Sequence, residues 1–301
     1  MVAVRLAFRS AAALRSDTTE DPPGAERPKA PRKPKERSNM EAATSASRVP
    51  AVVHPALMSD PWFMVAVLGV YLYFVTVAGP QFMEFRKAYK LKKLIMAHNL
   101  IQVVSCLYVL NEVFFITDYA VQYFWECRDF GKSPEHVRRH FELAHFLFWL
   151  KLSELVETVI FVLRKKQNQV SKLHIFHHFS TVTLVYMMMH FNENGTAAYF
   201  CVFLNSIVHI CMYSYYFVAA VADKDFVRTL TPVKKAITVM QMTQFAFILI
   251  QVVFQLVLCG IPRFVLYYYT AVITAMFYGF YDFFTTSYQS KKRHKSLATP
   301  N

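Results

Sequence analysis

The chain has 301 residues, of which 55% are hydrophobic and 16% aromatic, and only seven are glycine. A soluble domain of this length is rarely so apolar, so the composition favours an integral membrane protein and excludes an ordinary soluble enzyme domain. The formal net charge is +13. The basic residues are scattered over separate loops, which argues against a nucleic-acid-binding surface.

Residues 1–55 differ in composition from the rest of the chain. The segment DPPGAERPKAPRKPKERSN is rich in proline and charge, which is typical of a disordered extension. The opening stretch, MVAVRLAFRSAAALRS, contains arginine, alanine and serine but no acidic residue, as a transit peptide does. We favour the alternative that it is an upstream extension, with Met40 as a second possible start.

Seven apolar segments follow, each close to the length of a helix that crosses a bilayer. We expect transmembrane helices over residues 62–78, 94–117, 142–163, 173–190, 196–221, 236–259 and 264–288. The connections between them are short, so the predicted fold class is an all-α, polytopic membrane protein with seven transmembrane helices. The predicted membrane domain covers residues 56–290, and a basic tail covers residues 291–301.

Loop charge predicts the orientation of these helices. The segments EFRKAYKLKK, RKKQNQVSK and DKDFVRTLTPVKK and the tail KKRHK are basic, whereas HFNENG has no Lys or Arg and GIPR has one. By the positive-inside rule, the basic loops and the C-terminus are cytosolic, and the membrane domain begins on the lumenal side. The excess positive charge also favours contact with anionic lipid or phosphate. The sequon at Asn194 lies in a short lumenal loop, and we expect it to stay unmodified.

The five cysteines fall into two groups. Cys127 and Cys259 both lie at the lumenal surface in the predicted topology, where an oxidising compartment permits a disulfide. We therefore predict a bridge between them. The other three, Cys106, Cys201 and Cys211, lie inside predicted helices, and we expect them to be buried packing residues.

Ionisable groups at membrane depth are costly and usually mark function. The third segment carries Lys151, Glu154 and Glu157 within KLSELVET. The two carboxylates are one helical turn apart and would repel each other if both were ionised. Each is therefore expected to have a partner, such as Lys151 or an imidazole.

The fourth segment contains KLHIFHHFS, with three histidines at helical spacings of three and four. His174, His177 and His178 therefore fall on one helical face. Packing alone is a poor explanation for three imidazoles on one turn, so we interpret them as a functional cluster. Single histidines such as His98 and His190 are instead assigned to packing or interface positions.

The fifth and sixth segments add two polar stripes at helical spacing. Their members are Asn205, His209, Met212 and Tyr216 in NSIVHICMYSYY, and Thr238, Gln241 and Gln244 in TVMQMTQ. A single Asn, Gln or Thr in a span usually joins helices, and these tyrosines would also suit a membrane interface. Taken together, four helices have polar faces in their cytosolic halves and Phe, Met, Leu and Val in their lumenal halves. We therefore expect a chamber with a polar mouth and an apolar blind end.

These four motifs, in this order, resemble the ELO family of very-long-chain fatty acid elongases. The resemblance covers residues 60–292 and includes GPQFMEFRKAY after the first segment. It implies a condensing enzyme of the endoplasmic reticulum membrane that joins a long-chain acyl-CoA to malonyl-CoA. The products would be a 3-oxoacyl-CoA, CO2 and CoA, with no prosthetic group. One difference is Glu157, where the family usually has Asp, so the carboxylate reaches further by one methylene.

The resemblance also implies partners and a set of site residues. Family members associate with the reductases and dehydratase of the elongation cycle, and often with each other. The predicted catalytic residues are Lys151, Glu154, Glu157, His174, His177, His178 and His209. The predicted substrate-binding residues are Asn205, Tyr213, Tyr216, Gln241, Gln244, Lys172, Lys234 and Lys235, with the lysines facing the CoA phosphates at the cytosolic mouth.

The expected chemistry centres on His177. Soluble condensing enzymes usually carry the acyl group on a cysteine, but a neutral imidazole is also a competent nucleophile. We expect His177 to form an acyl-imidazole and His209, with Asn205, to stabilise the developing negative charge. His174 and His178 would orient their neighbours or shuttle protons. No metal is expected.

Two other functions use similar features. A di-iron membrane desaturase or hydroxylase also has HxxHH boxes, but such enzymes need several histidine clusters, and here there is one box plus the isolated His209. A seven-helix receptor has the same number of spans and the same orientation. Its usual cytosolic Asp-Arg-Tyr and Asn-Pro-x-x-Tyr signatures are absent from the sequence.

Overall fold

The structure is a computed structural model that describes residues 58, 60–118, 133–191 and 198–289. The chain divides into two units, Met1–Ala51 and Val52–Asn301, and all described residues belong to the second. The predicted extension over residues 1–55, the sequon at Asn194 and the tail over residues 291–301 lie outside the described residues.

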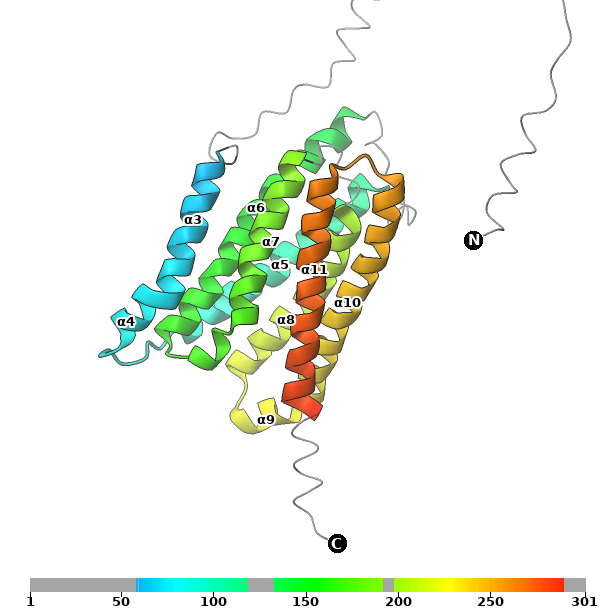
Figure 1. The fold of residues 1–301 in the computed structure, drawn as a ribbon. Helices are drawn as coiled ribbons and strands as arrows, with labels where there is room; N and C mark the ends of the chain where they lie inside the picture. Colours follow the sequence, from blue (N-terminus) through cyan, green and yellow to red (C-terminus); the bar gives the residue numbers. More distant parts are fainter. Residues whose placement is uncertain (1–57, 59, 119–132, 192–197, 290–301) are drawn as a thin grey trace, which may run out of the picture. The chain divides into compact units, whose positions relative to one another are not determined.

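The described residues form helices and connecting turns, with no strand among them (Figure 1). The long helices are α3 (Pro61–Tyr73), α5 (Lys92–Ile116), α6 (Pro134–Leu163), α7 (Lys172–Phe191), α8 (Tyr199–Val221), α10 (Thr231–Leu258) and α11 (Arg263–Phe284). The short ones are η1 (Phe74–Ala78), α4 (Gly79–Met83), η3 (Gln167–Gln169), α9 (Lys224–Thr229) and η5 (Thr285–Gln289).

Among the residues that the structure describes, five helical stretches are long and apolar enough to cross a membrane. They are Pro61–Met83, Lys92–Ile116, Tyr199–Val221, Thr231–Leu258 and Arg263–Tyr288. The prediction of an all-α membrane protein is therefore confirmed. Helices α6 and α7 overlap the other two predicted spans, but they contain the charged and histidine motifs, which lower their hydropathy. Their crossing of the membrane stays a prediction.

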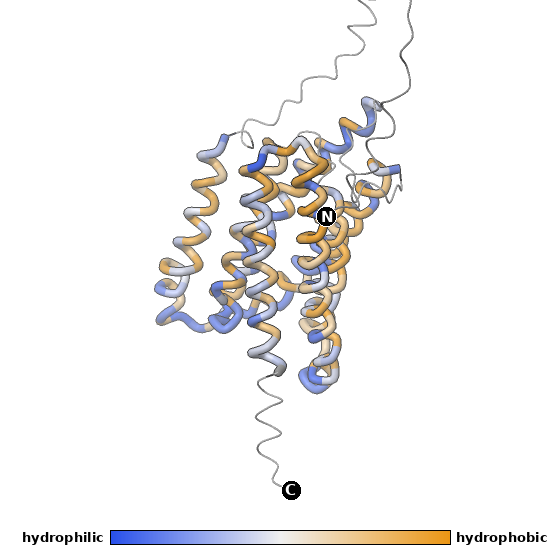
Figure 2. Tube along the Cα trace, turned by 45° about the vertical axis from the view of Figure 1, so that its right-hand side comes forward, coloured by the Kyte–Doolittle hydropathy of each residue, from blue (hydrophilic) through white to orange (hydrophobic). Residues whose placement is uncertain are grey.

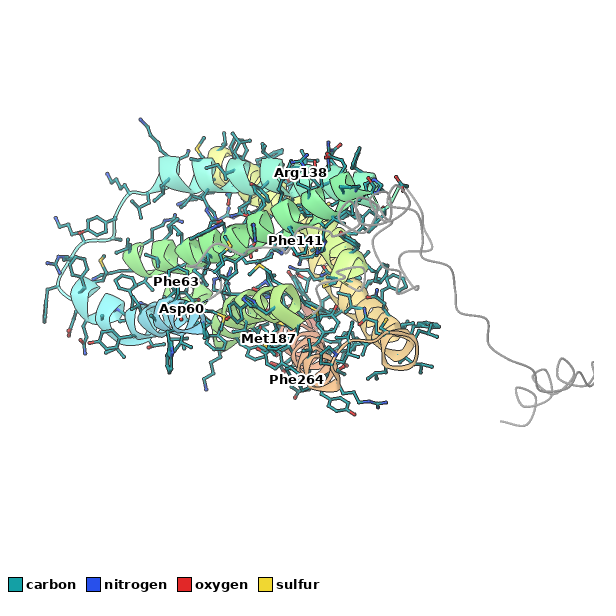
Figure 3. The ribbon with its side chains drawn as sticks, turned by 90° about the horizontal axis from the view of Figure 1, so that it is seen from above. Asp60, Phe63, Arg138, Phe141, Met187 and Phe264 are labelled. Carbon is teal, nitrogen blue, oxygen red and sulfur yellow. The ribbon has the colours of Figure 1, made fainter. Side chains whose placement is uncertain are left out.

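Six helices form a closed circuit in which each packs against the next. Along this circuit α5 packs on α8, α8 on α10, α10 on α11, α11 on α7, α7 on α6, and α6 on α5. Figure 3 views these helices from one end. The stretch from α3 to α4 lies outside the circuit and packs on α6, where Leu68, Tyr71 and Val75 join one apolar cluster with Leu155 and Val162. The circuit leaves an interior for a site.

Local sequence explains where several helices begin. Asp60 starts α3, because its carboxylate accepts a hydrogen bond from the backbone N–H of Trp62 at 2.9 Å. Asp223 caps α9 in the same way through two backbone N–H groups. Prolines occupy the first turns of α6 and α10, a position where a missing N–H costs no helical hydrogen bond.

The basic connections between helices gather at one end of the structure, as the predicted orientation requires. Figure 1 places α4, α9 and the start of α5 at one end of the helices, and Figure 2 shows hydrophilic residues gathered there. The exposed lysines of this end include Lys87, Lys165 and Lys224. The basic connections therefore lie together, and the assignment of this end to the cytosol stays a prediction.

Candidate active site

A cavity lies inside the circuit and is lined by residues of all six of its helices. At one end its lining is polar and includes Lys151, His177, Asn205 and Gln244. On α6 the lining continues from Lys151 to His140, eleven residues away, which corresponds to about 16 Å along the helix. The polar end is the one nearer the basic connections, since His177 lies in the second turn of α7.

Between its two ends the cavity has apolar walls. They include Leu143, Ala144, Leu147, Leu184, Val185, Met188, Val202, Ile248, Val272, Ile273 and Met276. The polar end and the apolar walls agree with the chamber predicted from the sequence. The far end differs from that prediction, because His140 and Tyr199 are among the residues that line it.

Four polar side chains form a closed loop of contacts at the polar end. The Lys151 Nζ atom donates hydrogen bonds to Glu154 Oε1 at 2.7 Å and to Asn205 Oδ1 at 3.1 Å. The Asn205 Nδ2 atom is 3.3 Å from His209 Nε2, and His209 Nδ1 is 3.4 Å from Glu154 Oε1. Glu154 is fully buried. The predicted carboxylate partners are thus confirmed for Glu154, and the loop joins α6 to α8.

His177 is the box histidine that lines the cavity. Its ring centroid lies 6.5 Å from that of His209 and 5.3 Å from that of His178. Its Nδ1 atom is buried and has no hydrogen-bond partner among the residues that the structure describes. An imidazole nitrogen in this state keeps its lone pair available when the ring is the matching tautomer.

The other two histidines of the box make different contacts. The His174 Nε2 atom lies 3.0 Å from Thr158 Oγ1, which in turn lies 3.0 Å from Tyr71 Oη. The His178 Nε2 atom lies 3.8 Å from Glu157 Oε2. The three rings do form one cluster, since the centroids of His174 and His178 are 4.3 Å apart and those of His177 and His178 are 5.3 Å apart. Helical spacing puts them on one side of α7, but only His177 lines the cavity, while the others face α6.

Some of the predicted substrate-binding residues line the cavity, and others do not. Gln244 and Asn205 line the cavity. Tyr213 is buried and donates a hydrogen bond to Glu157 Oε2 at 3.4 Å, so it supports the Glu157 side of the site. Gln241 is not among the residues that line the cavity, and its Nε2 atom donates to Met212 Sδ at 3.5 Å.

The remaining predicted contacts are at the surface. Tyr216 is partly exposed and lies edge-on to Tyr213. Lys172, Lys234 and Lys235 are exposed near the basic end, and the Lys235 Nζ atom lies 5.6 Å from the centroid of the Phe284 ring. Their positions leave them free to meet a ligand outside the cavity.

One group within the described residues has the chemistry of a metal site. Donor atoms of Glu157, His174 and His178 all lie within 4.8 Å of one another. Two imidazoles and a carboxylate suit a transition metal such as zinc or iron. The group excludes His177, so a metal there would be held beside the cavity.

The cysteines follow the sequence predictions only in part. Cys259 is disulfide-bonded, and Cys127 lies outside the described residues, so their pairing stays a prediction. Cys106 is buried as expected, but Cys201 is half-buried and Cys211 is exposed. Cys211 is two residues from His209, which turns it to the opposite side of α8.

Several polar contacts of the interior were not found from the sequence. Tyr71 is one of two tyrosines at the end of an apolar helix, and no helical spacing marks it. Gln102 on α5 donates to Ser153 Oγ at 3.0 Å, and it shares a buried face with Asn99. The spacing of three between Asn99 and Gln102 is a helical spacing, and it could have identified this polar face of the second predicted transmembrane helix.

Comparison with known proteins agrees with this arrangement. The profile of the GNS1/SUR4 (ELO) family matches residues 56–296. Very long chain fatty acid elongase F of Drosophila simulans is 34% identical over 258 residues, covering 80% of this chain and 96% of that protein. Elongase 7 of Drosophila melanogaster is 33% identical over 77% of this chain and 70% of its own length. Elongase 4 of Homo sapiens is 29% identical over 81% of this chain and 76% of its own length.

Proposed function

Since the chain belongs to the GNS1/SUR4 family, we propose that it is a very-long-chain fatty acid elongase of the endoplasmic reticulum membrane. It condenses a long-chain acyl-CoA with malonyl-CoA and gives a 3-oxoacyl-CoA that is two carbons longer. The relatives named as very long chain fatty acid elongases support fatty acid elongation, and the cavity suggests how the chain is held.

In this proposal the acyl chain lies along the apolar walls of the cavity, with its thioester at the polar end. Burial of a long hydrocarbon is favourable there, because each methylene removed from water contributes about 0.8 kcal/mol. The CoA part lies outside, where Lys172, Lys234 and Lys235 are exposed. Their charges suit the phosphates of CoA.

The first step forms an acyl-imidazole on His177. A nitrogen of the neutral ring attacks the thioester carbon, the carbon–sulfur bond breaks, and the imidazole proton goes to the sulfur, so that CoA leaves as a thiol. The nearby imidazole of His209 and the amide of Asn205 stabilise the negative charge that develops on the thioester oxygen.

The second step uses malonyl-CoA. Loss of CO2 leaves its electron pair as an enolate, whose carbon attacks the acyl carbon on His177. The carbon–nitrogen bond breaks, the 3-oxoacyl-CoA leaves, and His177 regains a proton from solvent. His174 and His178 orient their neighbours or move protons. The cycle consumes one proton and releases one CoA and one CO2.

One observation carries this proposal: His177 is the box histidine that lines the cavity, and its buried Nδ1 atom has no partner among the described residues. Buried ring nitrogens without a partner among the described residues also occur at His98 and His178, so the position of His177 on the cavity wall is what distinguishes it. Beside it lies the polar loop of Lys151, Glu154, Asn205 and His209. This loop supplies polar groups near the negative charge that develops during the reaction.

The test is an elongation assay in microsomes that contain the protein, with labelled malonyl-CoA and a panel of acyl-CoAs. We expect labelled products two carbons longer than the preferred substrates, in membranes with the wild-type protein and not in membranes with His177→Ala. Equal labelling in both membranes, or none with any acyl-CoA, would contradict the proposal. Copurification from the same membranes would test its association with the reductases, the dehydratase and other copies of the chain.

A further inference from the structure

Tyr71 belongs to the stretch outside the circuit, yet its hydroxyl group connects to the histidine box. It lies on α3 (Figure 1), in the apolar cluster that joins this helix to α6. The Tyr71 Oη atom lies 3.0 Å from Thr158 Oγ1, which in turn lies 3.0 Å from His174 Nε2. Tyr71 and Thr158 are buried, with exposed fractions of 5% and 0%. The two hydroxyl groups therefore form a chain of hydrogen bonds that ends on an imidazole of the box.

The available hydrogens give this chain a direction. Each hydroxyl group can donate one hydrogen. If Tyr71 donates to Thr158 and Thr158 donates to His174, both hydrogens are used and His174 Nε2 is the acceptor. In the opposite direction the Tyr71 hydrogen would need another acceptor, and the described part of the chain gives it none. A buried hydroxyl hydrogen without an acceptor is unfavourable, so we assign the direction from Tyr71 to His174.

His174 is the first ring of a row that leads to the cavity. Its centroid lies 5.3 Å from that of Phe161 and 4.3 Å from that of His178. The His178 centroid is in turn 5.3 Å from that of His177. These ring contacts restrict the plane of His174, but a half-turn of the ring within that plane would keep them and exchange its nitrogens with carbons. The hydrogen bond with Thr158 is the contact that distinguishes the two orientations.

We propose that Tyr71 is a positioning residue of the elongase that acts through Thr158 on His174, an inference that rests on the proposed function. The chain holds the His174 ring in one orientation, with its hydrogen on Nδ1, because the hydrogen bond at one ring nitrogen sets the tautomer. A fixed His174 keeps His178 and His177 in place for acyl transfer, and small misplacements of reacting groups lower the rate. Helix α3 thus contributes to the site, although none of its residues lines the cavity.

The first experiment compares purified variants by kcat and by KM for an acyl-CoA that the wild-type protein elongates. Thr158→Val removes the bond to His174, so kcat should fall roughly tenfold, which is the effect of about one hydrogen bond. Tyr71→Phe keeps the ring in its apolar cluster but removes the first hydroxyl group, so kcat should fall about threefold. KM should stay close to the wild-type value, because the contacts with the acyl chain are unchanged.

Two matched variants show whether the hydroxyl groups or the shapes of the side chains matter. Thr158→Ser keeps the hydroxyl group, so it should regain most of the kcat that Thr158→Val loses. Tyr73→Phe makes the same change as Tyr71→Phe on the same helix, but at a side chain that is 61% exposed, and it should leave kcat unchanged. Wild-type kcat in Tyr71→Phe, or a Thr158→Ser variant as slow as Thr158→Val, would overturn the proposal.

A spectroscopic measurement distinguishes failure of this inference from failure of the proposed function. The ring ¹⁵N signals of protein labelled with ¹⁵N-histidine show which nitrogen carries the hydrogen, and His174→Asn identifies the signals of His174. We expect the hydrogen on Nδ1 in the wild type and in Thr158→Ser, and a mixture of both tautomers in Thr158→Val. If no acyl-CoA is elongated, the proposed function fails, but these signals still test the chain. A hydrogen on Nε2 in the wild type, or unchanged signals in Thr158→Val, would overturn it.

Discussion

At the scale of single residues, Glu154 is the centre of the polar loop. Its Oε1 atom accepts from Lys151 at 2.7 Å and lies 3.4 Å from His209 Nδ1. Glu154 is therefore the carboxylate that faces both the Lys151 amine and the His209 ring.

We predict that Glu154→Gln lowers elongation by about 10²-fold while protein abundance stays close to normal. The amide oxygen still accepts from Lys151, so the buried amine keeps a partner, but the negative charge that polarises His209 is gone. Activity and abundance are measured in the same membranes. Glu142→Gln, an exposed change on the same helix, is the control. A parallel loss of abundance and activity would mean that the loop only holds helices together.

The two cysteines in the cavity are the rival acyl carriers. Cys106 and Cys201 both line it, and a thiol is the usual nucleophile of condensing enzymes. We predict that the Cys106→Ser and Cys201→Ala double variant retains at least half of the wild-type elongation rate, because His177 carries the acyl group. The rate is measured with saturating acyl-CoA. A loss as large as that of His177→Ala would transfer the carrier role to a thiol.

At the scale of elements, the close contact between α4 and α6 depends on Gly79. A Cβ atom there would lie 2.7 Å from Val162 Cγ1 and 2.7 Å from the carbonyl oxygen of Phe74. The second neighbour is backbone, so it cannot move aside cheaply. This contact fixes the outer stretch from α3 to α4 beside α6, where Tyr71 reaches Thr158.

We predict that Gly79→Ala lowers the stability of the purified protein by about 1–3 kcal/mol, because the extra methyl group overpacks this contact. Gly69→Ala is the matched control within α3. A Cβ atom at Gly69 has no neighbour within 4 Å, and alanine is the better helix former, so that variant should be neutral or more stable by about 0.5–1 kcal/mol. Thermal unfolding in detergent measures both. Equal effects of the two changes would contradict the packing account.

The helices themselves were largely predictable, because each motif repeats at the helical period. That period places Lys151 with Glu154, and Asn205 with His209, on the face that enters the interior. The period could not show that His177 lines the cavity while His174 and His178 contact α6. This difference arises because α6 lies on one side of α7 and the cavity on the other, which is a property of tertiary packing.

At the scale of the whole molecule, the far end of the cavity could not be predicted. His140 lies in the charged first turns of α6, Tyr199 begins α8, and no spacing within either helix relates the two residues. Their 2.7 Å contact exists only because α6 and α8 both pack on α5. The same holds for Cys211, whose exposure depends on which side of α8 faces its neighbours.

The metal content of the purified protein separates the elongase from the di-iron alternative. Glu157, His174 and His178 supply three donors within the described residues, whereas a di-iron centre needs many ligands around two irons. We predict iron well below one atom per chain and no loss of elongation after treatment with a chelator. Two irons per chain, with activity lost on chelation and restored by iron, would favour the oxidase.

The most direct test of the central claim, an acyl group carried on His177, is to give the purified protein a long-chain acyl-CoA without malonyl-CoA. The account predicts release of CoA in an amount equal to the protein, together with an acyl mass on the peptide that contains His177. His177→Ala should lose both signals. If CoA release strictly requires malonyl-CoA and no adduct is trapped, the two substrates react directly in a ternary complex, and the histidines act only as acids and bases.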